Sequence, residues 1–563
     1  MTGWTNFGRW RQRAEGLKHR PRLLAALSGI GLALAQPPFC FLPGLLGYAV
    51  LMFALEQDLG PRPKRAAYFL GWLSGFLYFL IGCFWVAEAF LVDAKTYGWM
   101  APFAATLLPT GIALFWGAFA VLYRWLATTL LAASRWRFVA FALLFSIFEI
   151  LRGTVMTGFP WDPSGATWKA GEAMSQTASL VGVYGLGLIT VLIFSAPAVV
   201  RDARTRKDAW PVGVALGLWI ACFAFGEVRL ATTVIKPGHL IVRVVQPNIG
   251  QRAKWTLGSF DKLFNTYVAM SKAPPKPGRP APDIIVWPEG ALPVTADDLF
   301  SQDSWTAPVM ARLLDDHQSL IMGVTRQELD SSGRLVWRNS LLFLDRKGGN
   351  TVIEGAYNKN KLVPFGEFTP FADITNKLGM KALTHFDDSF TPGEPTKPVQ
   401  FGSIPRVLPL ICYEGIFPGL DKTAYGASNE PDRPRWIVNA SNDAWFGLTT
   451  GPVQHLNLAS YRAIELGLPM VRSTPTGISG QIDPLGRLTS GYIALNNHGF
   501  VDISLLTPIT PIPAGSQSWL GGGLVWVELG FLSVLIAGFW FFKKVGRPAD
   551  GFRTRNRKNE IQG

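Results

Sequence analysis

The sequence predicts a polytopic α-helical membrane protein that carries one large α/β domain. Hydrophobic residues make up 49% of the 563 residues and charged residues only 16%, whereas about a quarter of an ordinary soluble protein is charged. Long apolar runs recur along the chain, and the segment between the last two runs has the pattern of a water-soluble domain. This composition argues against a purely cytosolic enzyme.

The apolar runs predict about eight transmembrane helices, although several of them are shorter than the roughly 20 residues that a bilayer requires. The first run is followed by Gln36, Pro37 and Pro38 rather than by a small-residue cleavage site, so we expect it to be retained and not removed as a signal peptide. The runs cover residues 23–35, 41–55, 66–87, 100–122, 138–151, 180–200, 210–225 and 520–542.

The basic residues predict the orientation of these helices. Lys and Arg in short loops collect on the cytoplasmic side of a bacterial membrane. In this chain they gather at both termini and in every second connection, whereas the intervening short connections hold only Lys95, Arg152 and Lys169. We therefore expect both termini in the cytoplasm and the long segment between the seventh and eighth helices on the outer side.

The domain organisation follows from this orientation. We expect a membrane domain of seven helices at 1–226, an extracytoplasmic domain at 227–519, a C-terminal transmembrane helix at 520–542 and a basic cytoplasmic tail at 543–563. The net charge of +14, from 53 Lys and Arg against 39 Asp and Glu, falls mainly in the cytoplasmic segments. It therefore reflects membrane topology and does not indicate a nucleic-acid partner.

The outer segment has short, β-rich apolar runs separated by helical patterns, which predicts an α/β or α+β domain with its own core. A Pro-rich connection at 273–282 is expected to be a surface loop. We expect helices around 260–270, 305–317 and 452–466. We expect strands at 239–246, 283–287, 319–325, 340–345, 407–413, 435–440 and 470–473.

Cys412 stands in a setting that suits a nucleophile. It ends a strand-like apolar run and is followed by the sequence YEG, at a strand-to-turn junction that presents a side chain at the edge of a sheet. A buried core cysteine is the alternative, and the residues alone leave both readings open. The other cysteines, Cys40, Cys83 and Cys222, lie in or beside apolar runs and are expected to be small buried hydrophobes.

Glu289 is a candidate general base. It stands in the sequence WPEG directly after an expected strand, and the preceding proline holds it rigidly at the end of that strand. A salt-bridged or helix-capping glutamate is equally compatible with this position, so the residues alone do not decide its role.

Two further segments carry groups that suit a binding or catalytic loop. Residues 357–370 (YNKNKLVPFGEFTP) hold Lys359, Lys361 and Glu367 in a stretch too rich in Pro and Gly for a regular element. Residues 439–447 (NASNDAWFG) place Asn, Asp and Trp behind an expected strand, as binding loops often do. Lysines in a loop are usually only solvated, so neither segment is specific by itself.

Metal and nucleotide sites are not expected. The six histidines form no HExxH motif, the four cysteines form no CxxC pair, and no GxxxxGK[ST] loop occurs in the sequence. Near the end of the fifth apolar run, Glu149 and Arg152 stand three residues apart and are expected to pair on one helical face.

Four motifs together resemble the carbon–nitrogen hydrolase (nitrilase) superfamily. They are WPEG at Glu289, YNKNKLVPFGEF at Lys359, ICYEG at Cys412 and NASNDAWFG around Trp445. The apolar runs and the sequence LRGTVMTGFPW at 151–161 are in addition similar to the apolipoprotein N-acyltransferase family of bacterial membrane enzymes. The resemblance covers essentially the whole chain, and it implies a nitrilase-like four-layer αββα sandwich for the outer domain.

The resemblance assigns roles to single residues. The catalytic set Glu-Lys-Cys falls on Glu289, Lys359 and Cys412; Lys361 is not the match, because the family's lysine stands eight residues before the Glu of PFGEF. Gly290 departs from the family, which often has Ser there, without putting catalysis in doubt. Accessory or substrate-binding roles fall on Trp255, Asn339, Glu367, Tyr413, Glu414 and Trp445.

The activity implied by the resemblance is transfer of an acyl chain from a phospholipid donor to a diacylated apolipoprotein acceptor, by ping-pong catalysis through a thioester on Cys412. The implied location is the bacterial inner membrane, with membrane lipid as a partner, no cofactor, no nucleic acid and a monomeric state. Two alternatives stay open on the sequence: a membrane-tethered amidase that hydrolyses a C–N bond, and a transporter or scaffold that carries a degenerate domain.

Overall fold

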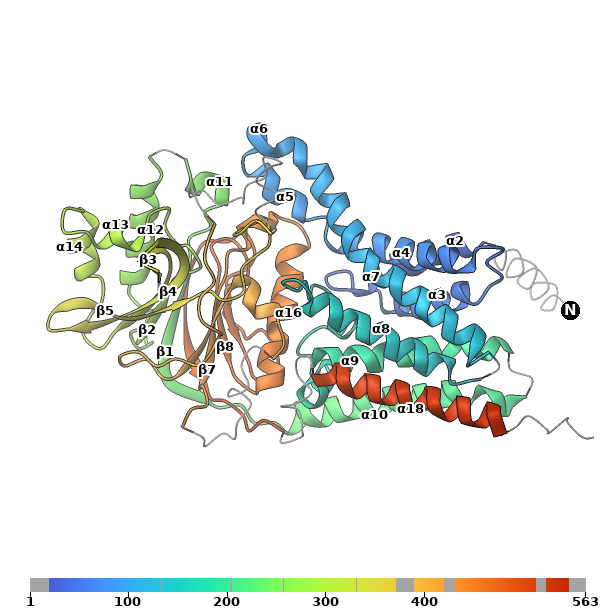
Figure 1. Ribbon diagram of the computed structural model, residues 1–563. Helices are drawn as coiled ribbons and strands as arrows, with labels where there is room; N and C mark the ends of the chain where they lie inside the picture. Colours follow the sequence, from blue (N-terminus) through green and yellow to red (C-terminus); the bar gives the residue numbers. More distant parts are fainter. Residues whose placement is uncertain are drawn as a thin grey trace, which may run out of the picture.

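A helical part and an α/β part lie side by side in the protein, and the C-terminal helix returns to the helical part (Figure 1). The structure is a computed structural model. Much of the basic N-terminus and of the basic tail, on which the expected orientation partly rests, lies outside the residues that it describes. These residues are 20–132, 134–202, 205–256, 258–330, 332–370, 389–419, 431–512 and 523–545.

Each of the eight apolar runs lies on a helix in the described part of the chain. Two short helices, α5 (Val86–Leu91) and α6 (Ala94–Tyr97), lie between the third and fourth of these helices. The helices on the runs are α2 (Pro21–Ala35), η1 (Leu42–Leu46) with α3 (Gly47–Leu55), α4 (Pro63–Gly82), α7 (Ala101–Thr129), α8 (Arg137–Thr154), α9 (Ala178–Ser195), α10 (Trp210–Thr232) and α18 (Gly523–Val545).

Four helical stretches of the described chain are long and apolar enough to cross a membrane: Pro63–Gly82, Ala94–Thr129, Met174–Val200 and Trp210–Thr232. The helices on the first, second and eighth runs are apolar but shorter in their apolar part. Helix α8 carries three charged residues within its 18 residues. Four crossings are therefore supported directly by length and composition, and the full count of about eight stays a prediction.

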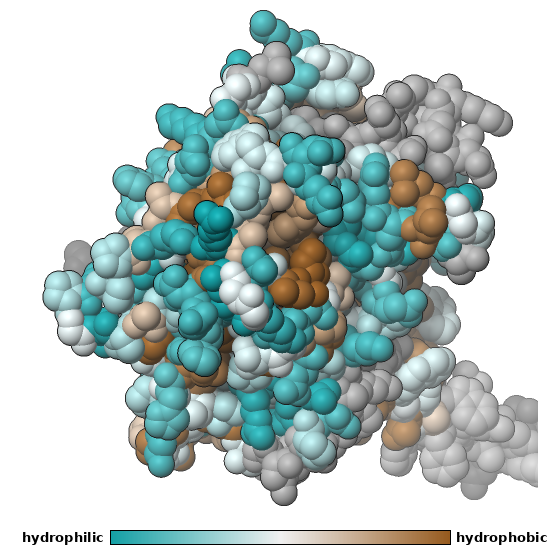
Figure 2. Space-filling view, turned by 90° about the vertical axis from the view of Figure 1, so that its left-hand side faces the viewer, coloured by the Kyte–Doolittle hydropathy of each residue, from teal (hydrophilic) through white to brown (hydrophobic). Residues whose placement is uncertain are grey.

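The helical surface and the surface of the α/β part differ in kind. The face of the α/β part that is turned away from the helices is largely hydrophilic, with a hydrophobic patch near its centre (Figure 2). Large apolar side chains are instead exposed along the helices, as expected for surfaces that contact lipid. They include Phe103, Leu107, Leu114, Val214, Leu216, Ile220, Phe531 and Val534.

Small residues allow the helices to approach closely. A Cβ atom at Gly44 would collide with the carbonyl oxygen of Gly31 on α2, and a Cβ atom at Gly71 on α4 would collide with the carbonyl oxygen of Trp116 on α7. Close approach through glycine is typical of helix packing in membranes, where apolar side chains gain little by leaving lipid. The helical part is therefore packed through backbone contact at these points.

The α/β part contains two mixed sheets. In the first sheet the order is β10-β1-β2-β3-β4-β5, with β1, β2 and β3 parallel and the other neighbours antiparallel. In the second sheet β6, β7 and β8 are parallel and β9 is antiparallel to β8. The strands are β1 (Pro237–Gln246), β2 (Ile284–Val286), β3 (Ser319–Leu329), β4 (Leu335–Lys347), β5 (Asn350–Asn358), β6 (Val407–Ile411), β7 (Trp436–Ala440), β8 (Met470–Ser473), β9 (Gly480–Ile482) and β10 (Gly499–Leu506).

Buried side chains join the two sheets. Val244 and Ile321 of the first sheet share one hydrophobic cluster with Val438 and Val471 of the second. A second cluster joins the first sheet to helices α12 (Phe260–Lys272), α13 (Ala296–Phe300) and α14 (Thr306–Ala311). A third cluster joins the second sheet to helix α16 (Gly451–Leu466).

Helix α16 also binds the helical part, which lies on its other side (Figure 1). Asn457 and Tyr461 each donate a hydrogen bond of 2.9 Å to a carbonyl oxygen in the connection between α8 and α9. Glu465 accepts a hydrogen bond of 2.8 Å from the N–H of Val183 on α9. These side chains stand four residues apart and therefore share one face of the helix, so α16 fixes the α/β part to the helical part.

The strands that the sequence did not predict are β5, β9 and β10, and all three are edge strands of their sheets. Edge strands need no continuous apolar run, since most residues of β5 and β10 are at least partly exposed. The helix expected at 305–317 is wrong in its length, because α14 ends at Ala311 and turns follow. Helix α10 continues to Thr232, beyond the apolar run that predicted it.

Candidate active site

Three strand ends bring Glu289, Lys359 and Cys412 into one site. Glu289 follows β2, Lys359 follows β5 directly, and Cys412 follows β6 as the first residue of the short helix η8 (Cys412–Ile416). The φ angle of Cys412 is +50°, in the left-handed region that a residue with a side chain seldom adopts. Such backbone strain is typical of functional positions, and here it occurs at the residue predicted as the nucleophile.

A lysine between two carboxylates forms the charged centre of the site. Lys359 Nζ lies 2.9 Å from Glu289 Oε1 and 3.0 Å from Glu367 Oε1, and its side chain is buried. Asn339 on β4 donates hydrogen bonds to the same two oxygens, at 2.8 and 2.7 Å. Burial alone would lower the pKa of Lys359, but the two carboxylates and Cys412 raise it well above its usual range. The lysine is therefore a fixed cation.

The thiol of Cys412 is protonated at neutral pH. Burial, followed by the negative charge of Glu289, raises its pKa to about 12, against the opposing effects of Lys359 and of hydrogen bonds from Asn442 and Ser441. A thiolate is needed for nucleophilic attack. The site therefore suits a cysteine that loses its proton to a neighbouring base during attack.

Glu414 joins the loop of Lys359 to the strand of Cys412. Its Oε1 accepts hydrogen bonds from the hydroxyl of Tyr357 (2.9 Å) and the N–H of Asn360 (2.8 Å), and its Oε2 accepts one from the N–H of Ile411 (2.8 Å). Its side chain is buried, and burial raises the pKa of this carboxyl group while these hydrogen bonds and Lys359 oppose the shift. Glu414 therefore acts as a brace between the two sheets.

The remaining predicted residues are Tyr413, Trp255 and Trp445. Tyr413 points to the helical part, where its hydroxyl donates a hydrogen bond of 3.0 Å to the carbonyl oxygen of Gly158. Trp255 directly follows α11 (Gln251–Lys254), and Trp445 lies half-buried in the short helix η10 (Asp443–Phe446). The structure thus joins Asn339, Glu367 and Glu414 to the charged centre and its brace by hydrogen bonds, and it places Tyr413 at the boundary with the helical part.

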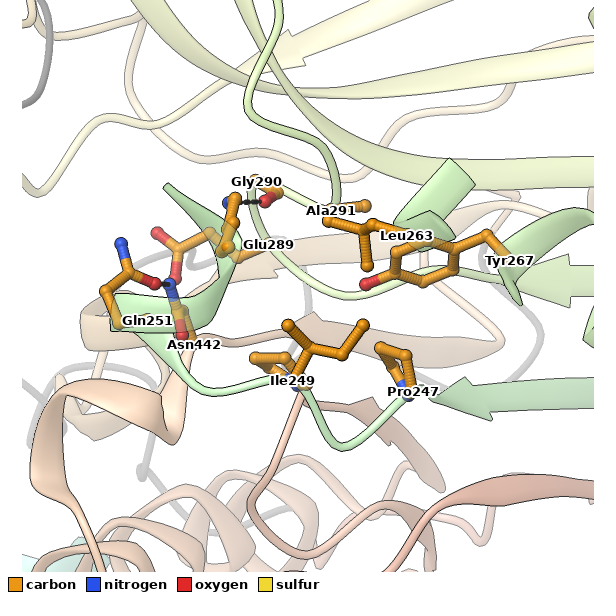
Figure 3. A pocket seen from close by; sticks show the side chains of 11 residues that line it. Pro247, Ile249, Gln251, Leu263, Tyr267, Glu289, Gly290, Ala291 and Asn442 are labelled. Atoms are coloured by element: carbon orange, nitrogen blue, oxygen red, sulfur yellow. Dashed lines mark hydrogen bonds between the residues drawn. The ribbon is translucent and has the colours of Figure 1, made fainter. Parts of the chain in front are cut away.

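A second buried lysine, which the sequence analysis missed, lies beside Glu289. Lys254 donates a hydrogen bond to the carbonyl oxygen of Gly290, and burial lowers its pKa to about 8 against the opposing effect of Glu289. It lines a small pocket together with Glu289, and the hydroxyl of Tyr267 points into this pocket (Figure 3). The resemblance assigned an accessory role to its neighbour Trp255, but nothing in the sequence singled out Lys254 itself.

One expectation for the helical part needs correction. Cys40 is exposed and not a buried hydrophobe, whereas Cys83 and Cys222 are buried as expected. The expected pair is present, with Arg152 and Glu149 4.0 Å apart, and Arg152 makes closer hydrogen bonds to the carbonyl oxygens of Phe159 and Trp161.

Among the residues that the structure describes, no three His, Cys, Asp or Glu side chains are grouped as a metal site requires. The residues of the site offer a buried thiol, a carboxylate and a fixed cation. This set suits acyl transfer through a covalent intermediate.

The protein combines a carbon–nitrogen hydrolase domain with helices that are long and apolar enough to cross a membrane. The family described as "Carbon-nitrogen hydrolase" matches residues 241–499, which include all three strand ends of the site and both sheets apart from β10 and the start of β1. The family described as "Apolipoprotein N-acyltransferase N-terminal domain" matches residues 28–196 of the helical part.

Relatives that match nearly the whole chain identify the family within this class. The chain is 43% identical to the apolipoprotein N-acyltransferase of Caulobacter vibrioides, over 91% of this chain and 93% of the relative. It is 35% identical to that of Rhodopseudomonas palustris, over 87% and 90%, and 34% identical to that of Brucella melitensis, over 91% and 94%. The chain belongs to the apolipoprotein N-acyltransferase family.

Proposed function

We propose that the protein transfers an acyl chain from a phospholipid to the α-amino group of the N-terminal diacylglyceryl-cysteine of apolipoproteins, through a thioester on Cys412. The observation that carries this proposal is a buried cysteine with a strained backbone, in the field of a lysine held between two carboxylates. The name of the relatives supplies the substrate class, and the apolar helices supply a surface for lipid.

In the first half-reaction, Cys412 attacks the ester carbonyl of the phospholipid. Glu289 takes the thiol proton during the attack, because the raised pKa of Cys412 leaves little free thiolate at neutral pH. Lys359 stabilises the negative oxygen of the tetrahedral intermediate. The intermediate then collapses to a thioester, and Glu289 returns the proton to the glycerol oxygen of the departing lysophospholipid.

In the second half-reaction, the amine of the diacylated apolipoprotein attacks the thioester. Glu289 accepts a proton from the amine, the C–S bond breaks, and the proton passes to the released thiolate while the amide is formed. The two substrates use the same cysteine in turn, so ping-pong kinetics are expected. Neither step draws on a metal ion or another cofactor.

The accessory residues have separate roles in this proposal. Asn339 and Glu367 hold Lys359 in place through the hydrogen bonds described above. Glu414 fixes the distance between the lysine loop and the nucleophile. Tyr413, Trp255 and Trp445 shape the surroundings in which the acyl chain and the acceptor bind.

The proposal includes the architecture of the whole chain. We place it in the bacterial inner membrane as a monomer with about eight crossings, with both termini in the cytoplasm and the α/β part in the periplasm. The clusters on both faces of each sheet support a four-layer αββα sandwich. Of the domain limits proposed from the sequence, 1–226, 227–519, 520–542 and 543–563, the first moves to the connection between α10, which ends at Thr232, and β1, which begins at Pro237.

Hydrolysis of a small C–N substrate by the same three residues is the alternative function. A hydrolase of that kind needs no more than a single membrane anchor, whereas this chain has four helices long enough to cross a membrane. The whole-chain relatives also carry the name of an acyltransferase and not of an amidase. The amidase alternative is therefore not favoured.

A two-substrate assay tests the proposed function. The purified protein in detergent is given a phospholipid with labelled acyl chains and a synthetic diacylated lipopeptide, and products are identified by mass spectrometry. We expect a triacylated lipopeptide and lysophospholipid in equal amounts. Release of labelled fatty acid with an unchanged lipopeptide would show a hydrolase and contradict the proposal.

A further inference from the structure

A buried histidine lies directly behind the nucleophile. Nε2 of His455, on helix α16, lies 3.2 Å from the carbonyl oxygen of Cys412. A carbonyl oxygen is only an acceptor, so Nε2 must carry the proton of this hydrogen bond. The bond reaches the residue whose backbone is held in the left-handed region, with φ of +50°. A side chain from α16 thus stabilises the conformation of the proposed nucleophile.

Buried charges hold the ring of His455 on its other side. Nδ1 lies 2.9 Å from Asp443 Oδ1, and Arg472 lies 2.8 Å from both oxygens of Asp443. All three side chains are buried. Burial alone would raise the pKa of Asp443, but Arg472 and His455 lower it to about 2, so this carboxylate is ionised. The ring therefore cannot turn without breaking a contact to a buried charge, which is costly.

Aromatic rings from the helical part and from η10 lie on the remaining side of His455. The centroid of Trp161, in the connection between α8 and α9, lies 5.8 Å from the histidine ring, and that of Phe446 lies 5.4 Å from it. Trp85, just before α5, packs on both of these rings. The indole N–H groups of Trp85 and Trp161 both donate to the side chain of Gln454, the residue before His455, at 3.1 Å.

We propose that His455 is a positioning residue that orients the peptide between Cys412 and Tyr413 for acylation, and that the helical part sets its position through Trp85 and Trp161. This inference rests on the proposed acyl transfer through Cys412. In a planar trans peptide the C=O and N–H groups point in opposite directions. The hydrogen bond from His455 therefore also directs the N–H of Tyr413 away from α16, and an N–H fixed in this way suits a developing oxyanion.

Two substitutions of the same residue separate positioning from stability. In His455→Gln the amide nitrogen stands near the position of Nε2, so the hydrogen bond to Cys412 is retained. In His455→Asn the shorter amide stands near the position of Nδ1, so the contact with Asp443 is retained and the bond to Cys412 is lost. The control is His498→Asn, because His498 is exposed.

The rate constant for acylation of Cys412 is measured at saturating labelled phospholipid in detergent, together with KM for the phospholipid and the thermal unfolding temperature. We expect His455→Asn to lower the rate constant about tenfold with KM unchanged, and His455→Gln to stay within about threefold of the wild type, as expected for one hydrogen bond to a strained backbone. His498→Asn should match the wild type.

Equal rates for wild type, Asn and Gln variants would overturn the inference, and so would equal losses in both His455 variants that follow their loss of folded protein. If both variants fail to fold, Gln454→Ala replaces them, and a lowered rate constant with unchanged KM supports the inference while an unchanged rate constant overturns it. A wild-type protein that is never acylated at Cys412 would instead overturn the proposed function.

Discussion

The two sheets contribute different things to the site. The first sheet carries the charges: Glu289 follows β2, Asn339 lies on β4 and Lys359 follows β5. The second sheet carries the nucleophile, and its helix α16 is the element that binds the helical part through a row of hydrogen bonds. The charged groups thus hold one another in place, whereas the nucleophile is held through the contacts of α16 with the helical part. The helical part is therefore expected to influence the cysteine more than the lysine.

The largest effect should come from the nucleophile on the second sheet. Cys412→Ser should abolish measurable acyl transfer, since a serine hydroxyl is a much weaker nucleophile than a thiolate in a site built for a thiol. The measurement is formation of triacylated lipopeptide. Cys40→Ser is the matched control, because Cys40 is exposed and lies in the helical part, and it should retain full activity. Transfer by the Cys412 variant at the wild-type rate would show that the second sheet does not supply the nucleophile.

The next effect should come from the cation on the first sheet. Lys359→Met removes the charge between Glu289 and Glu367 and should lower the rate of transfer on the order of hundreds-fold, as the loss of oxyanion stabilisation usually does. Lys361→Met is the matched control two residues away, where the ammonium lies over the ring of Phe417 and not between carboxylates. A loss of similar size in both variants would contradict the assignment of the cation to Lys359.

A smaller effect is expected from the brace between the sheets. Glu414→Gln replaces one of two accepting oxygens by an NH2 group that cannot accept an N–H, so part of the contact between the two sheets is lost. We expect the transfer rate to fall by about tenfold and the thermal unfolding temperature to decrease. Glu354→Gln, at a partly exposed ion pair with Lys347 on the first sheet, should change neither quantity strongly. Full activity of Glu414→Gln would show that the sheets keep their spacing without it.

The smallest expected effect is a shift in the pKa of the Cys412 thiol. Burial and Glu289 raise the pKa of Cys412, and Lys359 lowers it. The rate of alkylation of Cys412 by iodoacetamide should therefore increase with pH, with the midpoint of the increase near pH 12. Glu289→Gln removes a negative charge and should shift the midpoint to lower pH, and Lys359→Met should shift it to higher pH. Shifts in the opposite directions would show that these charges do not act on the thiol.

Comparison of sequence and structure shows which parts of the fold leave a local signal. Central strands such as β2 and β7 are buried throughout and appear in the sequence as continuous apolar runs. The edge strands β5, β9 and β10 were missed, and two of them are mostly only half-buried. Lys359 does lie in a loop as expected, but because β5 was missed, the sequence did not place this loop at the end of a strand.

The residues of the site also differ in whether the sequence alone reveals them. Residues that carry chemistry, such as Glu289 and Cys412, stand in short motifs whose residue types and order are specific. His455 and Lys254 are known as neighbours of the site only from the fold, because each reaches it from a helix distant in sequence.

The most direct test of the account is the mass of the intact protein after incubation with phospholipid in the absence of an acceptor. The account predicts an increase by one fatty-acyl chain, located at Cys412 by peptide mapping and removed when the diacylated lipopeptide is added. The Cys412→Ala variant should show no increase. An unmodified wild-type protein that still produces triacylated lipopeptide, or an acyl chain located at another residue, would contradict the thioester on Cys412.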